Sequence, residues 1–163
     1  MSDSTKSQFD EFSDPLENYE PPQFSDPLEQ ALDEEPVAAI QSQPYTAIPA
    51  DTTVAETLQK LVGDQIACLM IEDKGKLVGL VSDRDILDKV ALEYDEVKDR
   101  PVSEIMTTDP IYVRDSDSSA AALCVMAVSG YRHVPVVDLE ENIVGIISPQ
   151  RVTQFLRSHF NGD

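Results

Sequence analysis

Two polar residues, Ser82 and Asp85, stand where an apolar run ends and a helical pattern begins. At such a junction the free backbone N–H groups and the positive end of the helix favour a phosphate or the polar edge of a sugar. The serine hydroxyl can donate to a phosphate oxygen, and the carboxylate can accept from both hydroxyls of a ribose. The same spacing also caps a helix, with Ser82 at the N-cap and Asp85 at N3, so two interpretations stand side by side.

A second junction of this kind begins at Ser148 and differs in its charge. Pro149 suits the first position of a helix, but Arg151 stands where the first junction has Asp85. A cation in the first turn opposes the helix dipole by about 0.3–1 kcal/mol when it is exposed. A nearby anion would remove that cost.

Both junctions belong to a segment that is written twice in the chain. Leu77–Ser82 matches Ile143–Ser148, and Pro36–Ile40 matches Pro101–Ile105. Each copy is predicted to run as short strand, amphipathic helix, strand, strand and helix. A unit that cannot close its own core is usually stacked on its copy, and the crevice between the copies is a natural ligand site.

The apolar periodicity sets the expected limits of these elements. In the first copy we predict a helix over 53–62, strands over 67–71 and 77–81, a helix from Ser82 and a polar linker over 95–100; in the second, a helix over 117–128, strands over 134–137 and 143–147, and a helix from Pro149. Leu87 and Phe160 are expected on the buried faces of the last helices. Ala120–Val128 is apolar throughout and is expected to be buried on all sides, as are the thiols of Cys68 and Cys124.

The repeated pattern resembles a stand-alone CBS domain pair, also called a Bateman module, over roughly residues 36–158. The resemblance is carried by Leu77–Leu87, by Arg132–Asp138, and by Ile105–Thr107 where the second copy begins. It implies an α+β fold in which tandem CBS domains, two βαββα-type repeats, pack pseudo-symmetrically behind a disordered N-terminal tail. The corresponding division of the chain is a tail over 1–35, a first CBS repeat over 36–98 and a second over 99–163.

The resemblance also implies roles for individual residues at an adenine-nucleotide site. In CBS modules that bind such nucleotides, a Ser or Thr followed three residues later by Asp contacts the ribose, and Ser82 and Asp85 match this motif. An Arg–His pair before the central strand of the partner repeat reaches the phosphates, and Arg132 and His133 hold those positions. The adenine would lie against apolar walls, for which the candidates are Ile48 and Val134–Pro135.

Simpler explanations stay open for several of these residues. Arg132 suits a surface ion pair, His133 a half-buried histidine, and Ile48 and Pro135 the core. Arg151 departs from the ribose motif, so the resemblance implies one competent site. The implied regulatory ligand is an adenine nucleotide (AMP, ADP, ATP) or S-adenosylmethionine, with no tightly required cofactor.

The first 35 residues differ in composition from the rest. They hold four prolines, no glycine and few aliphatic residues, which cannot offset the entropy of ordering. They nevertheless contain one six-residue string twice, at Phe12–Glu17 and Phe24–Glu29, each copy reading as a helix start. The duplication is either a recent one in a solvated linker or a docking peptide that is presented twice to a protein client.

Composition and charge limit the classes of function that this chain can have. The net charge of −19 repels nucleic acid and anionic membranes, so we expect neither as a partner. No apolar run approaches the roughly 20 residues that span a bilayer, and no secretory signal is visible, so we expect a cytoplasmic protein. No nucleophile–base pair, metal cluster or Gly-rich phosphate loop is recognisable, which argues against an enzyme.

We therefore predict a non-catalytic regulatory module that binds an adenine nucleotide in the crevice between two CBS repeats and signals to a partner. A homodimer is expected, because CBS pairs usually dimerise through their helices. The alternative is a ligand-free dimeric adaptor that recruits a client through the duplicated motif.

Overall fold

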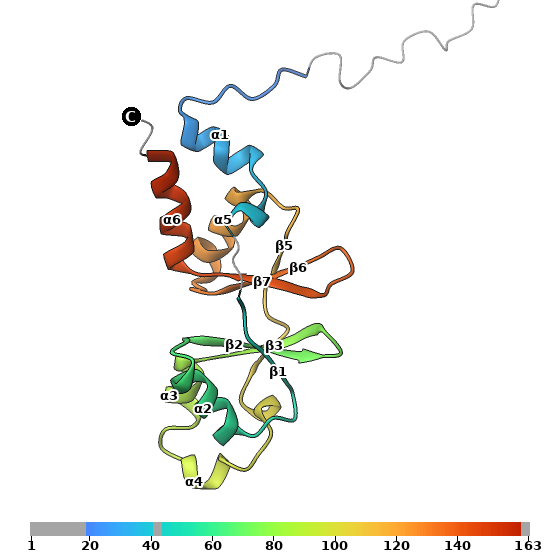
Figure 1. Ribbon diagram of the computed structural model, residues 1–163, viewed down its shortest axis with the longest axis vertical. Coiled ribbons are helices and arrows are strands. Elements are labelled where there is room, and N and C mark those ends of the chain that lie inside the picture. Colours follow the sequence, from blue (N-terminus) through green and yellow to red (C-terminus); the bar gives the residue numbers. More distant parts are fainter. Residues whose placement is uncertain (1–18, 41–43, 161–163) are drawn as a thin grey trace, which may run out of the picture.

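The computed structural model of the chain describes residues 19–40 and 44–160, which form a mixture of helices and strands (Figure 1). The first half contains α1 (Pro27–Glu34), the 3-10 helix η1 (Val37–Ala39), β1 (Ala47–Pro49), α2 (Val54–Gly63), β2 (Cys68–Asp73), β3 (Lys76–Ser82), α3 (Asp83–Lys89) and α4 (Tyr94–Val97). The second half contains the 3-10 helix η2 (Val102–Glu104), β4 (Thr107–Thr108), β5 (Val113–Arg114), α5 (Ser119–Ser129), β6 (Val134–Val137), β7 (Ile143–Ile147) and α6 (Pro149–Phe160).

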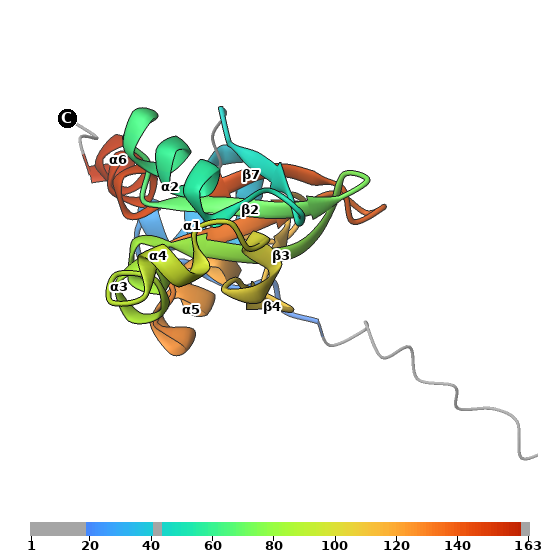
Figure 2. The ribbon, with the colours of Figure 1, turned by 90° about the horizontal axis from the view of Figure 1, so that it is seen from below.

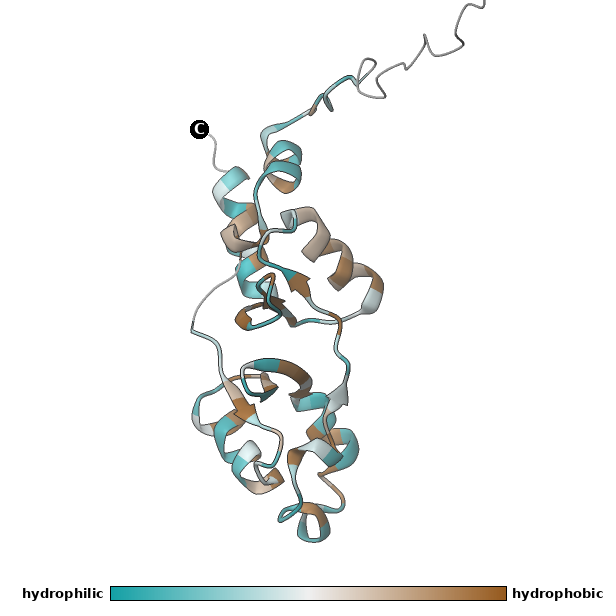
Figure 3. Cartoon of the chain, turned by 90° about the vertical axis from the view of Figure 1, so that its right-hand side faces the viewer, coloured by the Kyte–Doolittle hydropathy of each residue, from teal (hydrophilic) through white to brown (hydrophobic). Residues whose placement is uncertain are grey.

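Two bodies are stacked along the long axis of the molecule, with their sheets next to each other in the middle (Figure 1). The first body holds the sheet β1-β2-β3-β4 and the second the sheet β5-β6-β7. In both, a parallel strand pair is followed by an antiparallel one. Met70 and Leu80 of the first sheet pack with Ile143 of the second, and Figure 3 shows apolar residues concentrated in the strands where the bodies meet. The predicted duplication is therefore confirmed in three dimensions.

The predicted helices and strands of both copies are present. Their ends move by at most two residues, except that the helix from Ser82, which we expected to reach Tyr94, ends at Lys89. Local signals explain this agreement. Thr53 caps α2 and forms a reciprocal capping box with Glu56, and Gly130 ends α5 in the left-handed conformation. The region 95–100, which we expected to be a linker, contains part of the single-turn helix α4.

Apolar positions that we expected to be buried face solvent. Leu87 on α3 is 70% exposed, Phe160 at the end of α6 is 69% exposed, and Val128 on α5 is 89% exposed. Cys124 is exposed too, whereas Cys68 is buried as expected. The reason in α5 is that the helix covers only one side of its body. Ala122 faces inward, so an all-apolar helix still leaves one face in solvent.

The 3-10 helix that precedes the strands of each repeat packs into the core of the other body. Around η1, the N–H of Val37 donates to the carbonyl of Asp117 (2.7 Å), and the Val37 side chain is fully buried in the second core. Around η2, the N–H of Val102 donates to the carbonyl of Thr52 (2.7 Å), and its side chain is fully buried in the first core. The two packed bodies therefore do not coincide with the sequential stretches 36–98 and 99–163.

The expectation of a disordered tail over all of residues 1–35 is wrong for its last part, where α1 packs on α5 and α6. Asp26 caps α1 by accepting from the N–H of Glu29 (2.8 Å), and the Glu29 carboxylate accepts from Ser25. Ala31 is buried in the second core. The second copy of the duplicated string thus begins a helix of the fold, and the first copy, Phe12–Glu17, lies outside the described residues.

A histidine on α6 fixes the segment that follows α1. His159 Nδ1 lies 2.9 Å from the carbonyl of Phe155, and Nε2 lies 3.0 Å from the Glu35 carboxylate. Both partners only accept, so both ring nitrogens donate best when the imidazole is protonated. The Phe155 carbonyl and then Glu35 raise the pKa of His159. Since the folded-state pKa is the higher one, this contact stabilises the fold fully below the unfolded value of 6.5 and is lost as the pH rises through the raised pKa.

We therefore predict that wild type exceeds His159→Gln in Tm at about pH 5.5 and that the difference vanishes by about pH 9. Thermal unfolding of both proteins across this range, followed by circular dichroism, measures the difference. A gap in Tm that widened toward alkaline pH would contradict this account.

Candidate functional site

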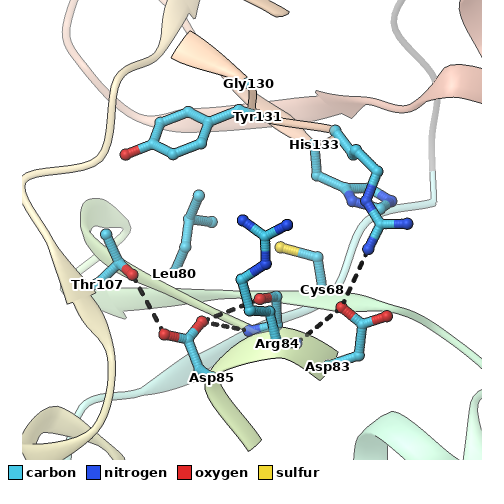
Figure 4. Close-up of a pocket in the computed structure, with 11 residues that line it drawn as sticks. Cys68, Leu80, Asp83, Arg84, Asp85, Thr107, Gly130, Tyr131 and His133 are labelled. Atoms are coloured by element: carbon cyan, nitrogen blue, oxygen red, sulfur yellow. Dashed lines mark hydrogen bonds and ion pairs between the residues drawn. The ribbon is translucent and has the colours of Figure 1, made fainter. Parts of the chain in front are cut away.

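A pocket of about 250 Å³ opens between the two bodies, and Figure 4 shows the side chains around it. The first body contributes the end of β3, the start of α3 and β4, and the second body contributes the segment that joins α5 to β6. The lining residues are Cys68, Leu80, Ser82, Asp83, Arg84, Asp85, Thr107, Gly130, Tyr131, Arg132 and His133.

The pocket floor is organised by the carboxylate of Asp85. Its Oδ2 accepts from the backbone N–H (2.9 Å) and the hydroxyl (3.0 Å) of Ser82. Its Oδ1 accepts from Lys89 Nζ (2.8 Å) and, at 3.4 Å, from the hydroxyl of Thr107. Burial raises the pKa of Asp85, but the hydrogen bonds from Lys89 and Ser82 outweigh it and hold this pKa below its usual value. Asp85 is therefore an ionised acceptor at neutral pH, and it still lines open space.

A close approach of two strands brings Thr107 to the pocket. Gly79 of β3 pairs with Thr108 of β4. A Cβ at position 79 would collide with the Met106 side chain and lie 3.1 Å from the carbonyl of Thr107. Because residue 79 has no Cβ, the two strands come this near without a shift of Met106 or of the Thr107 carbonyl, and the Thr107 hydroxyl lies 3.4 Å from Asp85.

The opposite wall carries a cation and a histidine from the second body. Arg132 Nη2 lies 3.5 Å from Asp83 Oδ1, so this ion pair joins the second body to the first. Burial, and then the positive charge of Arg132, lower the pKa of His133. The imidazole is thus neutral near pH 7 and can donate from one nitrogen and accept at the other.

Four of the six residues expected at the site line this pocket together: Ser82, Asp85, Arg132 and His133. The other two do not. Ile48 is 2% exposed and belongs to the core of the first body. Pro135 is buried in β6, where it pairs with Ile146. Both are buried strand residues, and the sequence pattern of an apolar strand residue is the same whether it faces a core or a pocket.

Several lining residues were not anticipated. Asp83 and Arg84 lie between Ser82 and Asp85, and Tyr131 directly precedes Arg132. Their position next to predicted site residues is the one sequence signal that could have identified them. Cys68 had none. Burial, followed by the charge of Asp85, raises the pKa of its thiol to about 12, which makes it an apolar wall and not a nucleophile.

A second cavity, of about 520 Å³, lies on the far side of Cys68 and His133, which line both. Ser148 and Arg151 line it in place of the Ser82 and Asp85 of the first pocket. Arg151 has one buried nitrogen, Nη1, without a hydrogen-bond partner. A guanidinium only donates, so Arg151 does not offer a ribose the acceptor that Asp85 does.

Residues 19–40 and 44–160, which the structure describes, show neither a candidate metal cluster nor a helix that could cross a membrane. No group of three or more His, Cys, Asp or Glu side chains in these ranges is arranged to hold a metal ion. No helix there has the length and apolar character needed to cross a bilayer.

Comparison with known sequences places the chain in a family. A model of the CBS domain matches it twice, over residues 37–92 and 102–158. The CBS domain-containing protein CBSCBSPB1 of Arabidopsis thaliana is 31% identical over 97 residues, which are 59% of this chain but 18% of that protein. A 17.7 kDa protein of Acidianus ambivalens is 28% identical over 113 residues, 69% of this chain and 67% of its own length. The chain thus spans less than a fifth of the first of these relatives.

Solved structures agree with this assignment. CBSX2 in complex with AMP has a TM-score of 0.67 and 26% identity, covering 76% of this chain and 96% of that one. The CBS domain pair of MJ0100, in complex with 5′-methylthioadenosine and S-adenosyl-L-methionine, has a TM-score of 0.66, the same identity and the same coverage. The predicted α+β architecture of two tandem CBS repeats is confirmed, and the chain belongs to the CBS domain family.

Proposed function

We propose that the pocket between the two bodies binds an adenine nucleotide and that binding regulates a partner of this chain. The observation that carries the proposal is Asp85, an ionised acceptor on the floor of an open pocket, facing Arg132 and His133 of the other body. The AMP complex of CBSX2 and the methylthioadenosine and S-adenosylmethionine complex of MJ0100, both 26% identical to this chain, support the class of ligand.

The two bodies supply different contacts to the ligand. Ribose hydroxyls donate to Asp85, in place of the long contact from Thr107. Arg84 and Arg132 offer guanidinium donors to a phosphate, and the neutral imidazole of His133 adds one more hydrogen bond. A ligand held in this way contacts both bodies at once, so its binding energy depends on how they are placed relative to each other.

The same residues favour a binding role over catalysis. Asp85 is engaged by Ser82 and Lys89, and the thiol of Cys68 stays protonated at neutral pH. Within the pocket lining, no hydroxyl or thiol is hydrogen-bonded to His133 in a way that would activate it.

The signal to a partner has two candidate outlets. Helices α3 and α5 lie on the same side of the molecule when it is viewed along its long axis (Figure 2). Each helix has an exposed apolar side chain, Leu87 on α3 and Val128 on α5, which supports the proposed homodimer. The second copy of the duplicated string begins α1, and its Phe24 and Leu28 are only half-buried, so a protein client at this end of the molecule stays a prediction.

We expect millimolar AMP to raise the Tm of the protein by several degrees. A ligand that binds only the folded state adds about 2.7 kcal/mol at a hundredfold excess over its Kd, which for a domain of this size is a shift of several degrees. Thermal unfolding with AMP, ADP, ATP and S-adenosylmethionine tests this, with GMP as the base-changed control. Native mass spectrometry of the same samples reports bound ligand and oligomeric state. No shift with any adenine ligand would exclude the nucleotide site.

A further inference from the structure

The charges at the pocket mouth are arranged in a way that binding of a nucleotide does not by itself require. Of the two lining carboxylates, Asp85 is engaged by Ser82 and Lys89 on its own body. Asp83 Oδ1 accepts from the N–H of Arg84 on its own body (2.9 Å) and also reaches the other body, where it pairs with Arg132 at 3.5 Å. Its side chain is 54% exposed and that of Arg132 is 64% exposed, so solvent screens the pair and it separates at little cost.

Asp83 and a ligand phosphate compete for the same partner. Arg132 is the one arginine or lysine that the second body contributes to the pocket lining. In the free protein the position of an oxyanion beside its guanidinium is held by the Asp83 carboxylate. A phosphate that binds Arg132 displaces this carboxylate and then lies close to it, as a like charge. A ligand without phosphate leaves the pair closed, and a cationic group gains from the nearby carboxylate.

We propose that Asp83 determines the charge selectivity of the pocket: it occupies Arg132 in place of a phosphate, weakens anionic adenine ligands and favours neutral or cationic ones. This inference rests on the proposed nucleotide site and names its regulation. Phosphate-bearing ligands open the Asp83–Arg132 pair, one of several contacts between the two bodies, whereas adenosine-like or sulfonium ligands keep it closed. The two classes of ligand therefore leave the bodies tied differently, which gives the module two distinguishable ligand-bound states.

The test is a charge series measured by isothermal titration calorimetry at low ionic strength. The probes are AMP with its dianionic phosphate, neutral adenosine, and S-adenosylmethionine, whose sulfonium and ammonium outweigh its one carboxylate and give a net charge of about +1 at neutral pH. Asp83→Asn keeps the size and the helix-start chemistry of the side chain and removes its charge. Asp88→Asn is the matched control, because Asp88 is an exposed carboxylate on the same helix that does not line the pocket.

Asp83→Asn is expected to tighten AMP about three- to tenfold, to leave adenosine within about twofold, and to weaken S-adenosylmethionine. The gain for AMP shrinks at high salt, since it is electrostatic. Asp88→Asn changes none of the three by more than about twofold, because its charge lies in solvent away from the ligand. Arg132→Gln has the opposite sign for AMP, which it weakens, and spares adenosine.

An unchanged ratio of AMP to adenosine affinity in Asp83→Asn overturns the inference, as does an equal gain in Asp88→Asn. Failure of the proposed function gives a different result, because then none of the three probes binds the wild-type protein and both proposals fall. A helix-start role alone for Asp83 would shift all three affinities together, whatever the charge of the ligand.

Discussion

Replacing Val37 by Asp is expected to lower the free energy of unfolding by about 3–5 kcal/mol. The position precedes all three strands, β5, β6 and β7, and the helices α5 and α6 of the body that it stabilises. Val37 is fully buried in the second core, among Val113, Val134 and Ile147. The substitution removes about 1.5–3 kcal/mol of apolar burial and leaves a carboxylate without a partner. Urea denaturation followed by circular dichroism gives the difference in free energy.

The neighbouring residue supplies the control. Ala38 is exposed, so Ala38→Asp introduces the same charge one position away and is expected to cost less than about 1 kcal/mol. Val102→Asp is the pseudo-symmetric counterpart and should destabilise the first body by a similar amount, because Val102 is fully buried there. Equal stabilities for Val37→Asp and Ala38→Asp would show that the η1 segment does not close the second core.

The second large effect concerns the ligand. Asp85→Ala is expected to weaken AMP about ten- to a hundredfold, since a hydrogen bond to a charged group contributes about 1.5–3 kcal/mol. The variant also loses the contacts of Asp85 with Ser82 and Lys89, so its Tm falls as well. Titration calorimetry at a temperature well below that Tm separates weak binding from unfolding.

Two companion variants make this result specific. Asp85→Asn keeps a helix-capping side chain but removes the charge, so it separates the ribose role of Asp85 from its structural role. Arg151→Ala changes the equivalent position of the second junction, where Arg151 lines the other cavity, and it should weaken AMP much less. If Arg151→Ala and Asp85→Ala weakened AMP equally, the single-site account would be wrong.

Local sequence was enough to predict most of the fold and the polar residues of the candidate site. Ser82 and Asp85 were predictable because a capping junction after a strand is encoded within a few residues. Arg132 and His133 were identified through a motif, and the structure brings them to the same pocket. The fold followed from the repeat, because Leu77–Ser82 and Ile143–Ser148 form equivalent strands in the two sheets.

The sequence does not show which positions tertiary packing buries or which distant segments it brings into contact. Ile48 and Pro135 are buried strand residues, and nothing in their pattern distinguishes a core wall from a pocket wall. Residues 27–34 were assigned to a tail by composition, since the surface on which α1 packs is formed by residues about a hundred positions later in the chain. The Asp83–Arg132 pair likewise joins two bodies whose relative position only the fold defines.

The exchange of leading segments has a consequence for how the protein is made on the ribosome. The segment 27–40 leaves the exit tunnel about a hundred residues before the α5 and α6 surfaces that it packs on. Residues 101–105 likewise complete the first core only after the whole first repeat has emerged. The first body can therefore close once residues 101–105 have emerged, whereas the η1 segment lacks its core until α5 and α6 are made, so folding does not proceed repeat by repeat along the sequence. A ribosome that stalls between the repeats leaves Val37 and Ile40 without the core that buries them, which makes this segment a substrate for chaperones.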